Sequence, residues 1–442
     1  MGSRKSPYEL SASQVTTPHP VVSMFWDLTH RRRDSLGSVL DMGAGDCRFS
    51  IGGRFNRYVG VEIDKERSRV AAVPENGKII SGCIFRHRSM GYDACIGNPP
   101  YVRHHDLESP WKEKTTEHLE RQLGIRLNRR SNLYLYFLSL GLLKTHGDGL
   151  LALVIPYEWV ARPSALGIRD YIKKQGWEVD VYRFTMPIFD GVLTTASISI
   201  VDKRQRSGQL SFFDISRDYK IFPRSGVVDG TRGVLDYAKR GQIWAMRGLS
   251  TGSQKIFTLT EKERIKHGLS RRDVVPCVTT LRYVPQTLRE LNPYSFKKHF
   301  IESGRRCWLI KSYREVRSAA LSAYLFAVPK SQRDTYTCRH QKPWFRFSLH
   351  PIPALLVSSG FMKLGPKVLV NKVKARAVGV VYGVHSKEKP RLRLLQRHLL
   401  RTDFESHVVA HARTLKKVEV KQLNCVLNNF PPRKNSHDTP RD

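Results

Sequence analysis

The chain lacks the features of several protein classes. Its seven cysteines form no Cys-x-x-Cys pair, and no group of His and Cys residues has the spacing of a metal site. Scattered cysteines in odd number are typical of reduced thiols rather than of a disulfide framework. No apolar run approaches the length of a membrane-spanning helix, and the first residues have no signal-peptide core. We therefore expect a soluble, cytoplasmic protein without a metal and without a membrane partner.

Acidic residues are few relative to basic ones. The 442 residues include 75 Lys+Arg against 39 Asp+Glu, which gives a formal net charge of +36. A surplus of this size favours a polyanionic partner, because a cation that neutralises a phosphate releases condensed counterions. The composition thus predicts a nucleic-acid-binding protein; the alternative is a basic surface that is merely well solvated.

The chain is long for a single hydrophobic core, so its length predicts two domains. The periodic pattern of apolar residues ends at 203–208, where charged residues and glycine occur, and we place the boundary between the two domains there. The expected parts are a flexible start at 1–15, a first domain at 16–205, a second domain at 206–428 and a disordered tail at 429–442.

The first domain begins with a nucleotide-binding βαβ pattern. A short apolar strand ends at Asp41, a turn with Gly43 and Gly45 follows, and a second strand ends at Glu62. The glycines let the backbone approach a ligand, and the acid can accept hydrogen bonds from both hydroxyls of a ribose. Cys47 stands where a third glycine would be expected, which favours a nucleoside without a pyrophosphate over a dinucleotide.

The tetrapeptide Asn-Pro-Pro-Tyr at 98–101 follows a third strand at 92–97. Its two prolines fix the backbone and remove donors, so the carbonyls beside them are free to accept from a ligand. An amide, a carbonyl and an aromatic ring suit a planar group that carries an amine. Because ligands of open parallel sheets bind at the carboxyl ends of the strands, Asn98, Asp41 and Glu62 should converge there.

The remaining pattern predicts further elements. In the first domain we expect a helix capped by Thr17, a mobile loop with some helix at 103–130, a helix at 133–143, a strand at 150–156 and a β-hairpin at 182–201. An Asp-Gly turn at 190–191 would leave Phe189 at an exposed bend. The second domain alternates basic and aromatic residues in a mixed, loop-rich pattern, with one or two amphipathic helices at 392–423.

The order of these motifs resembles the adenine-specific DNA methyltransferases of bacterial type II restriction–modification systems. It is similar to the gamma group, in which the cofactor loop precedes the catalytic motif and the target-recognition region comes last. The resemblance covers roughly residues 14–201, with looser similarity at 257–260, 343–345 and 418–430. It implies an α/β fold: a Rossmann-like S-adenosylmethionine-dependent methyltransferase domain followed by a mixed, loop-rich target-recognition domain.

The resemblance also implies the roles of individual residues. The catalytic group, which would bind a flipped-out adenine by its N6 amine and stack on both faces of the base, is Asn98, Pro99, Pro100, Tyr101 and Phe189. The group that would bind S-adenosylmethionine is Thr17, Pro18, Asp41, Gly43, Gly45, Glu62 and Ile63. Implied partners are duplex DNA and a separate restriction endonuclease, with the chain acting as a monomer.

One departure and three alternatives accompany this resemblance. Where the family has an Asp at the third cofactor strand, residues 81–85 read Ser-Gly-Cys-Ile-Phe, so one contact to the cofactor adenine would be lost. The same tetrapeptide could serve an RNA amine or a protein glutamine amide, although a basic second domain argues against the protein substrate. A catalytically silent DNA-binding subunit is the third alternative, and the missing Asp and Cys47 motivate it.

Overall fold

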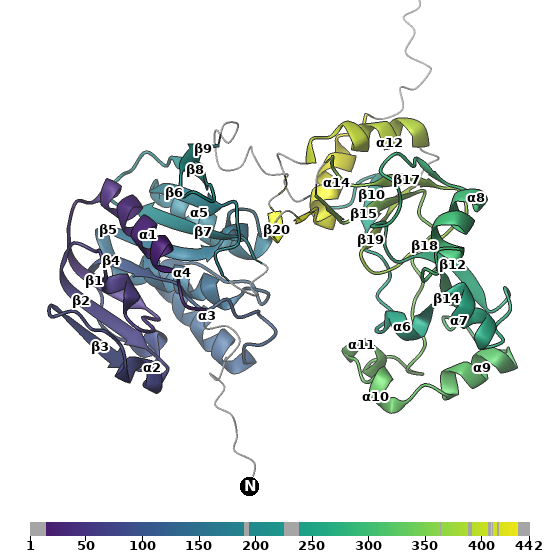
Figure 1. The fold of residues 1–442 in the computed structure, drawn as a ribbon, viewed down its shortest axis with the longest axis horizontal. Helices are drawn as coiled ribbons and strands as arrows, with labels where there is room; N and C mark the ends of the chain where they lie inside the picture. The colour runs from purple at the N-terminus through teal and green to yellow at the C-terminus, as the bar shows by residue number, and fades with distance from the viewer. Residues whose placement is uncertain are drawn as a thin grey trace, which may run out of the picture. The chain divides into compact units, whose positions relative to one another are not determined.

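The computed structural model describes residues 15–189, 194–224, 238–362, 364–387, 391–404, 408, 410–412 and 415–431. The chain forms two compact units (Figure 1). Unit 1 comprises Met1–Val234 and Val409–Thr414, and unit 2 comprises Leu235–Val408 and Leu415–Asp442. The turn expected at 190–191, and nearly all of the flexible start and disordered tail, lie outside the described residues.

A nine-stranded sheet with the order β3-β2-β1-β4-β5-β7-β6-β8-β9 is the centre of unit 1. Its strands are β1 (Leu36–Met42), β2 (Phe55–Glu62), β3 (Gly77–Ser81), β4 (Tyr92–Gly97), β5 (Thr145–Pro156), β6 (Glu178–Phe184), β7 (Ala196–Asp202), β8 (Leu210–Ile215) and β9 (Ile221–Pro223). The five strands from β3 to β5 in this order are parallel, and β7 is antiparallel to both its neighbours. The order reverses between β1 and β4, which is the switch point where open α/β sheets bind ligands.

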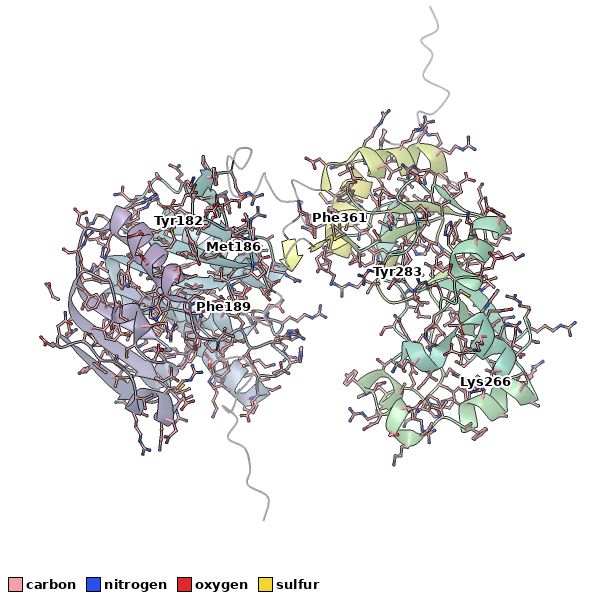
Figure 2. The ribbon with its side chains drawn as sticks, in the orientation of Figure 1. Tyr182, Met186, Phe189, Lys266, Tyr283 and Phe361 are labelled. Carbon is pink, nitrogen blue, oxygen red and sulfur yellow. The ribbon has the colours of Figure 1, made fainter. Side chains whose placement is uncertain are left out.

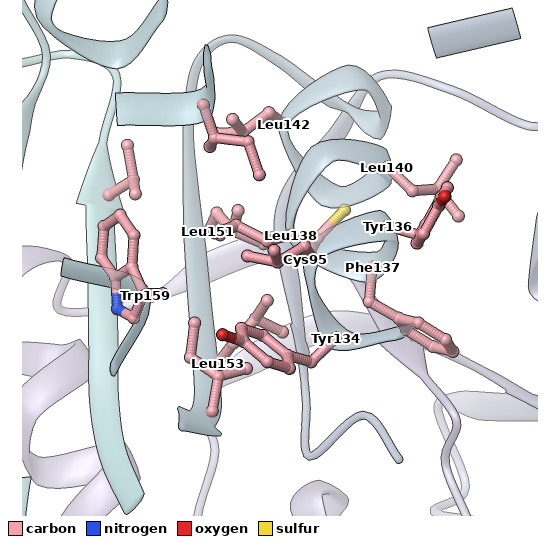
Figure 3. Close-up of a cluster of buried hydrophobic side chains, with 14 of the residues drawn as sticks. Cys95, Tyr134, Tyr136, Phe137, Leu138, Leu140, Leu142, Leu151, Leu153 and Trp159 are labelled. Atoms are coloured by element: carbon pink, nitrogen blue, oxygen red, sulfur yellow. The ribbon is translucent and has the colours of Figure 1, made fainter. Parts of the chain in front are cut away.

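Helices cover both faces of this sheet. They are α1 (His19–Arg32), α2 (Lys65–Arg69), α3 (Ser109–Leu123), α4 (Leu133–Lys144) and α5 (Leu166–Gln175), with short 3₁₀ turns η1 (Arg48–Ser50), η2 (Ile84–Arg86), η3 (Tyr157–Val160) and η4 (Pro163–Ala165). On one face α4 packs its apolar side chains on β5, where Leu138 and Tyr134 face Leu151 and Leu153 (Figure 3). The other face is covered by α1. Strands buried on both faces need unbroken apolar runs, which explains the sequence of β4 and β5.

Several boundaries in unit 1 differ from those predicted. Thr17 does not cap α1, because the N-cap position falls one residue later, at Pro18, whose backbone is extended. Pro20 lies in the first turn of the helix. The expected mobile loop at 103–130 contains α3, a helix of 15 residues. The strand expected at 150–156 begins earlier, at Thr145.

The sheet of unit 1 also extends past the boundary placed at 203–208. The hairpin of β6 and β7 forms as expected, but β8 then pairs in parallel with β6, and β9 pairs with β8. The polar segment between β7 and β8 is therefore a connection within one sheet, and the division falls after Val234 rather than after residue 205.

Unit 2 is mixed and rich in loops, as its sequence predicts. A five-stranded sheet has the order β10-β19-β15-β17-β13, and a four-stranded sheet has the order β11-β14-β12-β18. Their strands are β10 (Ile243–Met246), β11 (Thr258–Leu259), β12 (Val274–Val278), β13 (Glu290–Leu291), β14 (Trp308–Ile310), β15 (Leu355–Ser358), β17 (Val368–Asn371), β18 (Arg376–Ala377) and β19 (Val381–Ser386). The helices are α6 (Gln254–Phe257), α7 (Glu261–Lys266), α8 (Pro293–Phe296), η5 (Lys297–Ile301), α9 (Ala319–Phe326), α10 (Lys330–Arg333), α11 (Tyr336–Arg339), α12 (Leu392–Arg401) and α14 (Val420–Asn428).

The helical prediction for 392–423 was wrong in its middle part. Helix α12 ends at Arg401, and the strands β20 (Ala410–Ala412) and β21 (Leu415–Lys417) lie between it and α14. β21 pairs with β16 (Gly360–Phe361), and pairing of this kind overrides an amphipathic pattern that is only a local preference. Among the described residues, no helix has the length and apolar character that crossing a membrane requires.

Candidate active site

A cavity of about 380 Å³ lies within unit 1 and is lined from the carboxyl ends of β2 and β4 and from the turn after β1. It brings together ten of the twelve predicted site residues: Thr17, Gly43, Gly45, Glu62, Ile63, Asn98, Pro99, Pro100, Tyr101 and Phe189. Figure 2 labels Phe189 within this unit. Pro18 and Asp41 do not line the cavity. Its volume falls in the range of small-molecule sites.

The glycine turn positions Glu62. Gly43 and Gly45 have φ of 87° and 56°, a left-handed backbone that favours glycine. In this conformation the Gly45 amide donates to Oε2 of Glu62 at 2.7 Å, and the Asp64 amide donates to Oε1 at 2.8 Å. The carboxylate is 6% exposed and lines the cavity. Two backbone donors therefore fix its orientation, and its remaining lone pairs can accept from ligand hydroxyls.

Cys47 takes up the backbone conformation that a third glycine would have. Its φ is 63°, which is uncommon for a residue with a side chain. The side chain is fully buried, and burial raises the pKa of the thiol to about 12. Cys47 is thus an uncharged packing residue beneath the glycine turn.

Asp41 lies beneath the cavity. Its side chain is fully buried, Oδ2 accepts a hydrogen bond of 2.6 Å from the Tyr58 hydroxyl, and Oδ1 has no partner. Burial raises the pKa of Asp41 to about 7; the hydrogen bond from Tyr58 opposes the shift, and the charges of Glu62 and Asp46 add to it. The role predicted for Asp41, direct contact with the cofactor, remains a prediction, and in this structure the hydrogen bond of its side chain is to Tyr58 of β2.

This raised pKa predicts a pH-dependent stability difference between the native chain and Asp41→Asn. Between the unfolded pKa near 4 and the folded value of about 7, the folded protein keeps a proton that the unfolded chain releases, so stability falls as pH rises. The asparagine variant lacks this titration. Between pH 5 and pH 8, the free energy of unfolding of Asp41→Asn should therefore rise by about 3 kcal/mol relative to that of the native chain. Denaturant titration at each pH measures both values. Parallel pH profiles for the two proteins would contradict the buried, raised pKa.

Asn98 presents its carbonyl oxygen without a partner. Its Nδ2 donates to Oγ1 of Thr17 at 3.0 Å and to the carbonyl of Val15 at 3.4 Å. A backbone carbonyl can only accept, so these bonds set the orientation of the amide. Oδ1 is buried and has no hydrogen-bond partner among the described residues. A buried acceptor left unpaired in a ligand cavity indicates a donor on the ligand.

Arg48 connects the glycine turn to the segment that orients Asn98. Its guanidinium makes a two-point contact with Asp46, with Nε 2.9 Å from Oδ1 and Nη2 2.5 Å from Oδ2. Its Nη1 also donates to the carbonyl of Thr17. A continuous series of contacts thus runs from the glycine turn through Arg48 and Thr17 to Asn98. The sequence reading missed Arg48, since one arginine in a chain with this many carries no signal by itself.

Tyr101 and Phe189 meet each other across the cavity. Their ring centroids are 6.0 Å apart with an interplanar angle of 79°, an edge-to-face contact. The Tyr101 hydroxyl donates to the carbonyl of Val154, and Phe189 is 5% exposed. A planar base between the two rings would need them farther apart and closer to parallel. The predicted sandwich therefore requires Phe189 to move.

An aromatic wall, which the sequence did not predict, closes another side of the cavity. Phe85 makes edge-to-face contacts with Trp111 of α3 and Phe137 of α4, at 5.1 and 5.2 Å between centroids. All three line the cavity, as do Gly82 and Cys83. A Cβ atom added at Gly82 would meet nothing within 4 Å. Gly82, within the segment where the family has an Asp, thus opens into free space rather than onto another side chain.

The fold and this site define a class of protein. A parallel sheet with the antiparallel strand β7, a glycine turn with an acid after the second strand, and a polar Asn-Pro-Pro-Tyr segment at the switch point are the features of the Rossmann-like methyltransferases that use S-adenosylmethionine.

Comparison with known proteins gives the family. A model of the Eco57I restriction-modification methylase matches residues 57–189, and a model of the C-terminal domain of the type II methyltransferase M.Eco57I matches residues 241–402. These matches, one in each unit, place the chain among the type II restriction–modification methyltransferases.

Individual relatives agree with this family. The chain is 25% identical over 421 residues to the type II methyltransferase M.XamI of Xanthomonas campestris pv. amaranthicola, covering 85% of this chain and 77% of the relative. It is 26% identical over 224 residues to M.AccI of Acinetobacter calcoaceticus, covering 43% of this chain and 41% of the relative.

Among solved structures, the type IIL restriction-modification enzyme MmeI in complex with DNA has a TM-score of 0.60 at 12% identity, covering 95% of this chain and 65% of that structure's chain. The type ISP enzyme LlaGI has a TM-score of 0.51 at 13% identity, covering 90% and 52%. These two structures bear on the fold alone, and the chain spans only part of each.

Proposed function

We propose that this chain methylates the N6 amine of an adenine flipped out of a specific duplex DNA sequence, and so protects that sequence from a partner restriction endonuclease. The observation that carries the proposal is the buried, unpartnered Oδ1 of Asn98 on the cavity wall. Family membership and the net charge of +36 support DNA as the substrate.

The residues of the cavity fit S-adenosylmethionine, which when bound supplies a methyl group on a sulfonium. The left-handed glycine turn leaves room for a ligand near the backbone, and the fixed carboxylate of Glu62 suits two ribose hydroxyls. Ile63 and the aromatic wall offer apolar surface to a flat ring. No other acid is required for this fit.

The acceptors at 98–99 would activate the adenine amine. The lone pair of this nitrogen is delocalised into the ring, which makes it a poor nucleophile. Oδ1 of Asn98 and the Pro99 carbonyl can each accept one amine hydrogen, which favours a pyramidal nitrogen and localises the lone pair toward the methyl group. The new N–C bond would form as the bond between the methyl group and sulfur breaks, and the amine proton, acidic only from that point, would pass to water, so no strong base is needed before transfer.

The identity of the methylated base tests this function. The native chain is incubated with S-adenosylmethionine labelled in the methyl group and with plasmid DNA, and the DNA is digested to nucleosides. We expect the label in N6-methyl-2'-deoxyadenosine and little transfer to a structured RNA offered in competition. Label on cytosine would instead indicate a cytosine methyltransferase, and preferential label on RNA would indicate an RNA methyltransferase. If calorimetry detects no heat of cofactor binding, the chain is a catalytically silent subunit.

Tyr101 should support base flipping. In Tyr101→Ala the fluorescence of a 2-aminopurine at the target position should increase less on binding than with the native chain, because a lost aromatic partner costs about 1–3 kcal/mol of stacking per base. Tyr101→Phe keeps the ring and loses only the hydroxyl that donates to Val154, so it should behave as the native chain. An alanine variant with the full fluorescence change would remove the stacking role.

Restoring the missing acid should strengthen cofactor binding. In Gly82→Asp the new carboxylate points from an open position and could accept from the cofactor's adenine amine. One hydrogen bond to a charged group would lower the dissociation constant about 10-fold. Calorimetry measures the dissociation constant of the cofactor for Gly82→Asp, Gly82→Asn and Gly82→Ala. The Asn variant controls for the charge of the new side chain, and the Ala variant controls for the added bulk. An Asp variant that binds no better than the Ala variant would show that the adenine amine lies elsewhere.

A further inference from the structure

Unit 2 holds a partly exposed loop in place with a half-buried cation, Lys367. The loop at 281–284 follows β12, and Nζ of Lys367 donates to three of its carbonyls: Leu281 at 2.9 Å, Arg282 at 2.9 Å and Val284 at 2.5 Å. Three bonds from one ammonium fix the path of the backbone. The side chains on the outer side of the loop are therefore not needed to hold its shape.

Two arginines without acidic partners flank the exposed ring of this loop. Tyr283 is 54% exposed, and its centroid lies 3.7 Å from Cζ of Arg305 and 5.6 Å from Cζ of Arg282. Neither guanidinium pairs with a carboxylate within the described part of the chain, and Nε of Arg305 has no hydrogen-bond partner. The adjacent Arg306, by contrast, pairs with Glu263 at 2.7 Å.

An exposed apolar segment contacts the residues that follow this loop. Nε2 of Gln286 reaches the carbonyl of Leu364 at 3.4 Å, which joins the loop to a second exposed segment. In that segment Met362 is 64% exposed and Leu364 is 79% exposed. No Asp or Glu occurs at 279–289 or at 359–387. These two segments are thus apolar and basic, and neither contains an acidic residue.

We propose that this surface, the Tyr283 ridge, contacts duplex DNA; its members are Arg282, Tyr283, Arg305, Met362 and Leu364. The inference rests on the proposed function and adds the place of contact in unit 2. The guanidinium groups would contact backbone phosphates, and the ring and apolar side chains would lie against sugars and base edges. Exposed apolar surface of this kind is otherwise unfavourable, and a polyanion is the partner whose charge complements the ridge.

Salt-dependent DNA binding tests the ridge. Affinity for a fluorescein-labelled 40-base-pair duplex of mixed sequence is measured by anisotropy at several salt concentrations, with the native chain and with Arg282→Ala, Arg282→Lys, Tyr283→Ala and Lys266→Ala. Figure 2 shows Lys266 well apart from Tyr283 on unit 2, and its removal subtracts the same charge. Arg282→Ala should bind several-fold more weakly, with a slope of log K against log salt reduced by about 0.9. Arg282→Lys and Lys266→Ala should keep the native slope.

Each other outcome has a defined meaning. If Arg282→Ala and Lys266→Ala lose affinity equally, only net charge matters and the ridge is not a contact surface. If Tyr283→Ala binds as the native chain does, the ring makes no contact. Tighter binding of a structured RNA than of the duplex would reassign the ridge to RNA. A chain that shows the expected slopes but transfers no methyl group to DNA would refute the proposed function and leave the ridge standing.

Discussion

Replacing Asn98 with alanine is expected to reduce the rate of methyl transfer by about 10³-fold or more, because it removes a buried acceptor on the cavity wall that has no partner among the described residues. The Pro99 carbonyl alone cannot hold both amine hydrogens, so the nitrogen stays planar and its lone pair stays in the ring. The rate is measured from tritium transfer to DNA at saturating cofactor, in single-turnover conditions that separate chemistry from product release.

Cofactor binding and a second variant provide the controls for Asn98→Ala. The dissociation constant of S-adenosylmethionine should change little, since Glu62 and the glycine turn are untouched. Asn98→Asp keeps one acceptor but loses the donor that reaches Thr17, so its activity should fall between those of the native and alanine proteins. Equal tritium incorporation by the native and alanine proteins would end the assignment of Asn98 as the amine acceptor.

The parts of the site that the sequence predicted are those formed by local pattern. The turn with Gly43 and Gly45 and the acid at Glu62 lie close together in the chain, and their spacing is set by one βαβ unit. The convergence of Asn98 with Glu62 was expected from a general rule on parallel sheets, and both residues line the cavity; Asp41, which was expected to converge there as well, does not line it. These features of the site could be predicted without a structure.

The parts that the sequence did not predict depend on contacts between distant residues. Thr17 was expected to cap a helix, but its hydroxyl lies against a side chain 81 residues away. The aromatic wall joins Phe85, Trp111 and Phe137 from three separate elements, and apolar residues of this kind are also normal core residues. Strand β8 was missed because β-strands depend on their neighbours more than on intrinsic preference.

The series of contacts from the glycine turn to Asn98 gives Thr17 a positioning role. Thr17 is 2% exposed, and its Oγ1 holds the Asn98 amide in the orientation that turns the carbonyl toward the cavity. Thr17→Val preserves the shape and the backbone carbonyl that Arg48 contacts, and removes only this acceptor. Without it the amide can rotate and present its NH₂ to the substrate amine, so we expect kcat to fall about 10- to 100-fold.

Two readouts separate positioning from a general effect on structure. The Thr17→Val protein should keep its thermal stability nearly unchanged and its KM for the cofactor within about twofold, while Thr17→Ser, which restores the hydroxyl, should recover most of kcat. A matching fall in Arg48→Ala, together with weaker cofactor binding, would follow from the contact of Arg48 with both Asp46 and Thr17. If valine and native proteins have the same kcat, the carbonyl of Val15 at 3.4 Å is sufficient to orient Asn98, and the hydroxyl of Thr17 has no part in it.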